Sequence, residues 1–90
     1  MTDNEEESLL TFPCEFPIKI MGKDEDILHI TISEIISRHA PDTKTENIKR
    51  RLSSKGRYVS VTVTINAISR AQLDAIYREL TASEYTLFVL

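Results

Sequence analysis

Hydrophobic and polar residues alternate without a break over residues 57–66, which read Arg-Tyr-Val-Ser-Val-Thr-Val-Thr-Ile-Asn. The valines and the isoleucine fall on one side of an extended chain, and the tyrosine, serine and threonines fall on the other. A strand of this kind buries one face against a core and leaves the other face open to water, a ligand or a partner. The pattern predicts a half-buried strand.

Three further segments have weaker strand patterns. Residues 17–21 form a predicted strand that ends at Gly22, residues 45–52 alternate apolar residues with lysine and arginine, and residues 84–90 are apolar on both sides. Pro17 has no N–H to donate, so we expect it at the first position of its strand or at a bulge.

Two segments have helical spacing. Residues 24–39 begin with three acidic side chains, which favour a helix N-terminus, and Pro41 ends the helix. Residues 27–32 are rich in β-branched side chains, so a strand is the alternative there, but the length and the acidic start favour a helix. The second helix begins at Ser69, three residues before Gln72 in a capping-box pattern, and continues to about residue 81. The predicted buried stripes are Leu28, Ile32, Ile35, Ile36 and His39 in the first helix, and Leu73, Ile76, Tyr77 and Leu80 in the second.

The order of these elements, βαββαβ, predicts the ferredoxin-like fold. Right-handed crossovers then give an α+β sandwich with a four-stranded antiparallel sheet in the order 4-1-3-2 and two helices on one face. The turn at residues 53–56 joins the second and third strands as a hairpin. We expect a single domain over residues 15–90, after an acidic tail at residues 1–14 that carries an apolar anchor at Leu9, Leu10 and Phe12.

The composition supports one globular domain, and the distribution of charge shows a basic segment in the middle of the chain. The 90 residues are 41% hydrophobic and 28% charged, and their net charge is −3. That value hides an asymmetry, because no acid occurs between Glu46 and Asp74, where the chain carries six lysine and arginine residues. Cys14 is the single cysteine, and the N-terminus lacks the basic start of a secretory signal, so we expect a cytoplasmic protein. No apolar stretch is long enough for a membrane helix.

The basic hairpin is the first candidate site. Its alternation predicts that Lys49 and Arg51 lie beside Tyr58 and Ser60 on the exposed side of the sheet, where they could bind a phosphate or carboxylate. The alternative is that cations on an edge strand prevent pairing with another sheet. Binding of RNA is a weaker interpretation, because the exposed side of the third strand offers one aromatic side chain. The candidate residues are Lys49, Arg51, Lys55, Arg57 and Tyr58.

Residues with catalytic or metal-binding chemistry are few. His29 and His39 lie on different sides of one helix, so we expect no metal site, and we expect His39 to cap carbonyl groups or fill the core. Cys14 has no base nearby in the sequence, so we expect an inert, buried thiol. Acylphosphatase-like catalysis needs an arginine that the loop at residues 22–24 lacks. We therefore expect neither an enzyme nor a cofactor.

Several segments together resemble the YbeD-like family of small uncharacterised bacterial proteins. They are Leu-Leu-Thr-Phe-Pro at 9–13, Ile-Met-Gly at 20–22, Arg-His-Ala-Pro at 38–41, Ser-Ser-Lys-Gly at 53–56, Val-Ser-Val-Thr at 59–62 and Ile-Asn-Ala at 65–67. The resemblance implies the ferredoxin-like fold, close to the ACT regulatory domains that bind amino acids, and it implies no activity or catalytic residue. In ACT domains the ligand binds where the first strand meets the first helix, which corresponds here to Gly22, Lys23 and Asp24. Gly22 would let a ligand approach the backbone there, or would simply make a tight turn.

These patterns predict a cytoplasmic, non-enzymatic regulatory or interaction module of the ACT-like kind. Its ligand would be a small anionic metabolite or a partner protein, and the alternative function is nucleic-acid binding by the basic hairpin. We also expect a homodimer, because Phe88 and Leu90 leave a second apolar side on the last strand, although the tail anchor could cover it instead.

Overall fold

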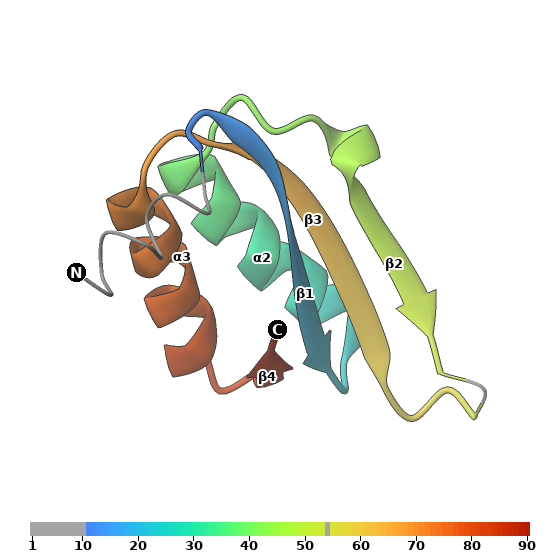
Figure 1. Cartoon of the computed structure of the whole chain (residues 1–90). Coiled ribbons are helices and arrows are strands. Elements are labelled where there is room, and N and C mark those ends of the chain that lie inside the picture. Colours follow the sequence, from blue (N-terminus) through green and yellow to red (C-terminus); the bar gives the residue numbers. More distant parts are fainter. Residues whose placement is uncertain (1–10, 54) are drawn as a thin grey trace.

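The computed structural model describes residues 11–53 and 55–90, and these form a four-stranded sheet with two helices on one face (Figure 1). The sheet order is β2-β3-β1-β4 and its strand pairs are antiparallel. This arrangement confirms the predicted ferredoxin-like topology. The elements in chain order are β1 (Cys14–Gly22), α2 (Glu25–His39), the 3₁₀ turn η1 (Thr45–Asn47), β2 (Ile48–Leu52), β3 (Val59–Ala67), α3 (Arg70–Ala82) and β4 (Thr86–Val89).

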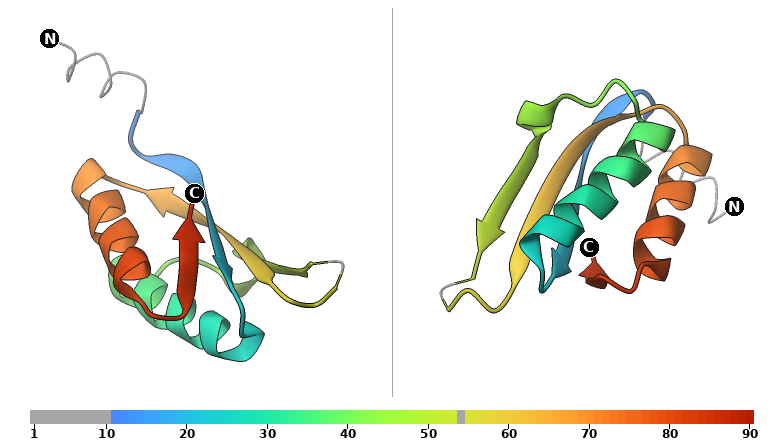
Figure 2. Two further views of the ribbon diagram at one scale, coloured as in Figure 1. Left: turned by 90° about the horizontal axis from the view of Figure 1, so that it is seen from below. Right: turned by 180° about the vertical axis from the view of Figure 1, so that it is seen from behind.

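The core lies between the sheet and the two helices, which cover the same face (Figure 2). The alternation in β3 is confirmed, because its valines and isoleucine are almost completely buried while its serine and threonines are half-buried. Both helical stripes are also confirmed, except that His39 and Tyr77 are half-buried at the margin of the core. No described helix covers the other side of the sheet. We call that side the open face.

The strand β1 is longer than predicted and Pro17 lies in its middle, opposite Thr64. The short β4 explains why a proline is tolerated there. Lys19 exchanges both of its backbone hydrogen bonds with Leu90, so the backbone groups of Pro17, two residues earlier, also point toward the β4 side of β1. The described part of β4 does not extend that far, so the missing N–H of Pro17 removes no hydrogen bond from the ladder.

The second and third strands are shorter than predicted at their starts. Residues 45–47 form η1 rather than a strand, and Arg57 and Tyr58 belong to the hairpin loop rather than to β3. The hydroxyl of Ser53 accepts hydrogen bonds from the backbone N–H groups of Arg57 and Tyr58, at 3.1 and 3.2 Å. A serine side chain can replace strand pairing in this way, which the alternation alone did not reveal.

Both predicted helix starts are confirmed, although the Gln72 side chain accepts a hydrogen bond from the Ile68 N–H at 2.8 Å rather than from the Ser69 N–H of a complete capping box. The carboxylate of Asp24 accepts a hydrogen bond from the Ile27 N–H at 3.0 Å, and the Ser69 hydroxyl accepts one from the Gln72 N–H at 3.1 Å. The amide of Gln72 also donates to the carbonyl of His39 at 2.8 Å. This last bond joins the start of α3 to the end of α2.

The strand β4 is shorter than predicted and pairs with the end of β1. Val89 lies opposite the buried Ile20 and is half-buried, whereas Phe88 lies opposite Met21 and is exposed. The hydroxyl of Tyr77 donates a hydrogen bond to the Leu90 carbonyl at 3.1 Å, which ties the end of the chain to α3.

The predicted tail lies largely outside the described residues, including Leu9 and Leu10 of its anchor. Phe12, the remaining anchor residue, packs against the core. None of the described helices is long and apolar enough to cross a membrane.

Candidate anion-binding surface

Cations from two strands lie in register on the open face. Lys49 of β2 and Lys19 of β1 are both paired with Thr62 of β3, so they flank its hydroxyl. In the next row Arg51 is paired with Ser60, whose other neighbour is Met21. The predicted contact of Arg51 with Ser60 is therefore confirmed, whereas Lys49 lies beside Thr62 rather than Tyr58. The prediction for Lys49 was wrong because residue numbers run in opposite directions along antiparallel strands, so Tyr58 lies opposite Ser53, whose N–H donates to the Tyr58 carbonyl at 2.8 Å.

A hollow of about 200 Å³ lies at the hairpin end of these rows. This volume is below that of a typical site for a drug-sized ligand, and it suits a single phosphate or carboxylate group. Two cations, three hydroxyl groups and the aromatic ring of Tyr58 contribute to its wall. The lining residues are Lys19, Met21, Arg51, Leu52, Ser53, Tyr58 and Ser60.

A second depression adjoins the first at Tyr58, whose side chain is 41% exposed. Its other lining residues are Lys23, from the connection between β1 and α2, and Arg57, from the hairpin loop. Tyr58 therefore separates the two cations of the first hollow, Lys19 and Arg51, from those of the second, Lys23 and Arg57. The Ser53 hydrogen bonds described above fix the backbone of Arg57 and Tyr58 in this position.

No acid within the described residues forms an ion pair with the cations that line the two hollows. Arg50, the middle cation of β2, points to the other side of the sheet and pairs with Glu25 of α2 at 3.4 Å. Lys55 lies in the exposed hairpin loop and lines neither hollow. The structure thus groups Arg51, Arg57 and Tyr58 with the neighbouring Lys49, and leaves Lys55 apart.

The sequence interpretation included Ser60 beside Arg51, but it missed Lys19 and Ser53 as members of the same hollow. The signal for Lys19 was present, because it alternates with Ile18 and Ile20 and so had to face away from the core. Its position across β3 from Lys49 depends on strand register, which the sequence pattern did not supply.

The connection at Gly22, Lys23 and Asp24, which the ACT resemblance suggested as a ligand site, has its space and its helix N-terminus occupied by the chain itself. A Cβ added to Gly22 would lie 2.6 Å from the carbonyl oxygen of Tyr85 and 2.9 Å from Leu28. The space beside Gly22 is therefore filled by the chain itself, and Asp24 already caps the helix N-terminus with its own carboxylate. Both features favour a packing role for Gly22. Lys23 and Asp24 line a depression with Glu84, Tyr85 and Leu87.

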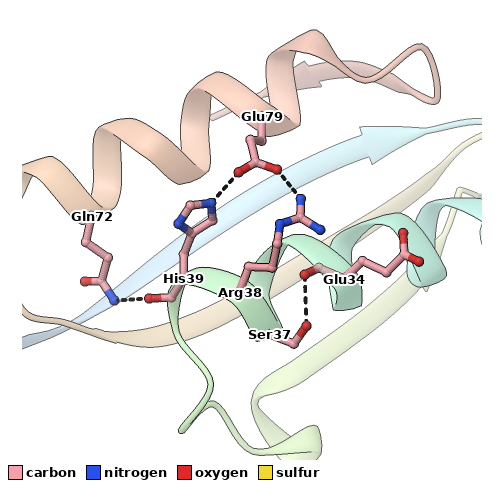
Figure 3. A network of polar contacts seen from close by, with 6 residues as sticks. All are labelled: Glu34, Ser37, Arg38, His39, Gln72 and Glu79. Carbon is pink, nitrogen blue, oxygen red and sulfur yellow. Dashed lines mark hydrogen bonds and ion pairs between the residues drawn. The ribbon is translucent and has the colours of Figure 1, made fainter.

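The main polar network of the helical layer joins α2 to α3. Arg38 and His39 of α2 both form ion-pair contacts with the carboxylate of Glu79 on α3 (Figure 3). The hydrogen bond from His39, followed by that from Arg38, lowers the pKa of Glu79 from its ordinary value of 4.5. The prediction that His39 fills the core or caps carbonyl groups was therefore wrong. Its imidazole instead contacts the carboxylate of Glu79 on the neighbouring helix.

Replacing Glu79 with glutamine is expected to lower the thermal midpoint modestly at neutral pH, because exposed ion pairs contribute little individually. The folded-state pKa of Glu79 is lowered, so its contribution is present above 4.5 and is lost as the pH falls through the folded-state pKa. The midpoints of parent and variant should therefore converge in acid. Thermal unfolding followed by circular dichroism from neutral pH to about pH 2 measures this difference.

Glu34→Gln is the matched control, because Glu34 is exposed on α2 and uses only its backbone carbonyl, which accepts a hydrogen bond from Ser37. Its midpoint should follow that of the parent at every pH. A gap between the Glu79 variant and the parent that persists unchanged in acid contradicts the interpretation.

The remaining reactive side chains lie away from the two hollows. Cys14 is half-buried at the start of β1 and packs against the core, rather than being fully buried as expected. His29 is half-buried in α2, and its Nδ1 atom has no hydrogen-bond partner among the described residues. Within the described chain, no three histidine, cysteine, aspartate or glutamate side chains form a group that could hold a metal ion.

Comparison with known proteins places this fold in a bacterial family. The family model described as "Protein of unknown function (DUF493)" matches residues 7–90. A UPF0250 protein of Chromobacterium violaceum is 45% identical over 87 residues, which are 97% of this chain and 98% of the relative. A UPF0250 protein of Neisseria gonorrhoeae is 43% identical over the full length of both chains, and one of Ralstonia nicotianae is 44% identical over 93% of this chain and 87% of its own. These matches confirm the resemblance to the YbeD-like proteins.

Proposed function

The chain belongs to the DUF493 family of proteins of unknown function, and from its own surface we propose that it is a small binding module whose open face takes an anionic ligand. The observation that carries this proposal is the hollow in which Lys19, Arg51 and Tyr58 converge from β1, β2 and the hairpin loop. We propose binding rather than catalysis, and a cytoplasmic location, as the sequence predicts.

The chemistry of the hollow favours a phosphate or carboxylate group. Lysine and arginine donate charge-assisted hydrogen bonds to such groups, and the Ser60 hydroxyl adds a neutral donor from the same row. Lys19 and Arg51, which line the same hollow from neighbouring rows, also repel each other weakly, and an anion between them relieves that repulsion. A metabolite or an acidic protein segment can present the anion, and both fit a regulatory or interaction module.

The simpler explanation for the cations is that they keep the edge strand β2 from pairing with another sheet. Lys49, Arg50 and Arg51 are all exposed on that strand, which agrees with this role. It does not account for Lys19, because Lys19 lies on β1, an interior strand of the sheet. The contribution of Lys19 to the hollow therefore favours an anion site over edge protection alone.

The double change Lys19→Glu with Arg51→Glu is expected to weaken binding of inorganic pyrophosphate at least tenfold. Each reversal replaces an attraction with a repulsion of roughly 1 kcal/mol or more at contact distance, and about 1.4 kcal/mol corresponds to a factor of ten. Amide chemical shifts from a ¹⁵N-labelled sample, titrated with pyrophosphate, measure the affinity and locate the site. The largest shifts in the parent should fall at residues 19–21, 51–53 and 58–60.

The matched control is Lys44→Glu with Arg78→Glu, which changes the net charge equally on exposed residues away from the hollow. It should bind pyrophosphate as the parent does. If the Lys19 and Arg51 variant binds as tightly as the parent, or if the shifts fall elsewhere, the open face is not the anion site.

Nucleic acid is the second candidate ligand, because the exposed ring of Tyr58 lies between cations of both hollows and could stack on a base. A single-stranded oligothymidine of about ten nucleotides in the same titration distinguishes it from a small anion. Several phosphate contacts make log K fall steeply with log salt, by about 0.7 per phosphate on a single strand. A steep slope together with loss of binding in Tyr58→Ala would favour nucleic acid.

A further inference from the structure

The outer side of β4 is an uncharged sheet edge. Residues 85–90 read Tyr-Thr-Leu-Phe-Val-Leu, and no described strand pairs with β4 on the side away from β1. Leu87 and Phe88 are 47% and 49% exposed, and Tyr85 and Leu90 are also exposed. An edge with unpaired backbone groups and exposed apolar side chains is a template for another strand.

The backbone direction of this edge follows from the hydrogen bonds to β1. Lys19 and Leu90 exchange two hydrogen bonds, at 2.8 and 3.3 Å, so the backbone groups of Leu90 point inward to β1. Alternation along an antiparallel strand then turns the N–H and C=O of Val89 outward. These two groups are available to an incoming strand.

The opposite edge of the sheet has the contrary character. Lys49, Arg50 and Arg51 are consecutive exposed cations on β2. Pairing β4 of one copy with β2 of another would bring apolar side chains against cations, with no acid in β4 to neutralise them. Of the two outer edges of the sheet formed by the described residues, only β4 itself is a compatible neighbour for β4.

We infer that two copies of this chain pair through their β4 strands, antiparallel and about a two-fold axis at Phe88. In that register Val89 of each copy lies opposite Leu87 of the other, so its outward backbone groups gain partners. The two Phe88 rings come together at the axis on the open face, since Phe88 lies on the same side as Met21. A closed two-fold contact of this kind uses both β4 edges and leaves none for further association.

The dimer would have one continuous eight-stranded sheet. Five strand spacings of about 4.8 Å separate Ser60 of one copy from Ser60 of the other, so the two hollows would lie about 24 Å apart on the same face. This consequence rests on the proposed anion site, whereas the dimer itself does not.

Sedimentation equilibrium over protein concentrations from about 1 μM to 1 mM tests the inference, because a short interface is expected to bind with micromolar affinity. The parent should shift from 10.3 kDa toward twice that mass as its concentration rises. Phe88→Glu should stay monomeric throughout, because it places two like charges at the axis. Ile30→Glu, a matched change at an exposed isoleucine of α2, should dimerise like the parent.

Amide hydrogen exchange adds a readout that does not depend on the variants. The Val89 amide should exchange more slowly at high concentration in the parent, and at one concentration-independent rate in Phe88→Glu. Circular dichroism establishes that each variant is folded, and pyrophosphate titration of Phe88→Glu tests the anion site separately. A parent that stays monomeric to millimolar concentration, or a Phe88→Glu variant that dimerises as the parent does, overturns the inference.

Discussion

Gly22→Ala is expected to lower the free energy of unfolding by about 3 kcal/mol, at the upper end of the usual range for an overpacked site. The added methyl group would lie 2.6 Å from the backbone oxygen of Tyr85, closer than van der Waals contact permits. The contact is with backbone, so relief requires that Tyr85, which immediately precedes β4, and the start of that strand move away from β1. The midpoint of thermal unfolding should fall by roughly 15 °C for a domain of this size.

Gly56 provides the control for this prediction. It has a positive φ of 68° and nothing within 4 Å of an added Cβ, so the conformation of its backbone, not space, demands glycine there. Gly56→Asn should therefore unfold near the parent temperature, since asparagine tolerates this conformation. Differential scanning calorimetry compares the two variants. A midpoint for Gly22→Ala within about 2 °C of the parent would show that β4 adjusts freely, against the packing role assigned to Gly22.

Ile32→Ala is expected to destabilise the protein by about 3 kcal/mol, because it removes a fully buried side chain and leaves a cavity. Ile32 lies on the stripe of α2 that faces the sheet. Total stability for a domain of this kind is about 5–15 kcal/mol, so this single change removes a large share of it. Urea unfolding followed by circular dichroism gives the free energy, and an unchanged slope shows that the variant unfolds in the same way.

Ile30→Ala is the same change two residues earlier on the same helix, where the side chain is 57% exposed. Its effect should stay within about 0.5 kcal/mol of the parent, because it leaves no cavity. The difference between the two variants then measures burial alone, since helix propensity changes equally in both. Similar losses at both positions would contradict the assignment of the buried stripe.

The open face, the hollow and the β4 edge all follow from one property of the fold. Two helices cover one side of a four-stranded sheet, so the other side and the two outer strands meet solvent or a partner. The distribution of charge then separates these surfaces. Cations gather at the β2 end of the open face and around the hairpin, while β4 has none.

Much of the fold was readable from the sequence because its signals are local. The alternation in β3, the apolar stripes of α2 and α3, the acidic start of α2 and the cap at Ser69 depend on residues within a few positions of one another. Their order then leaves few topologies, and the expected ferredoxin-like arrangement is the one observed. The candidate site was also partly predictable from local sequence, since the alternation in β2 placed Arg51 on the side of the sheet away from the core.

The sequence by itself therefore determined the main helices and strands, their order, and the side of the sheet on which the residues of the alternating strands lie, but not which side of β4 meets the core. Only the tertiary structure decided which distant residues meet. Strand register set Lys19 across β3 from Lys49, and the close approach of Tyr85 gave Gly22 its role. Because β4 is short, Pro17 can lie in the middle of β1 without removing a ladder hydrogen bond. Because Glu79 of α3 lies nearby, the side chain of His39 contacts that carboxylate. These contacts join residues far apart in the chain, and their geometry depends on how the whole core packs, which no local pattern encodes.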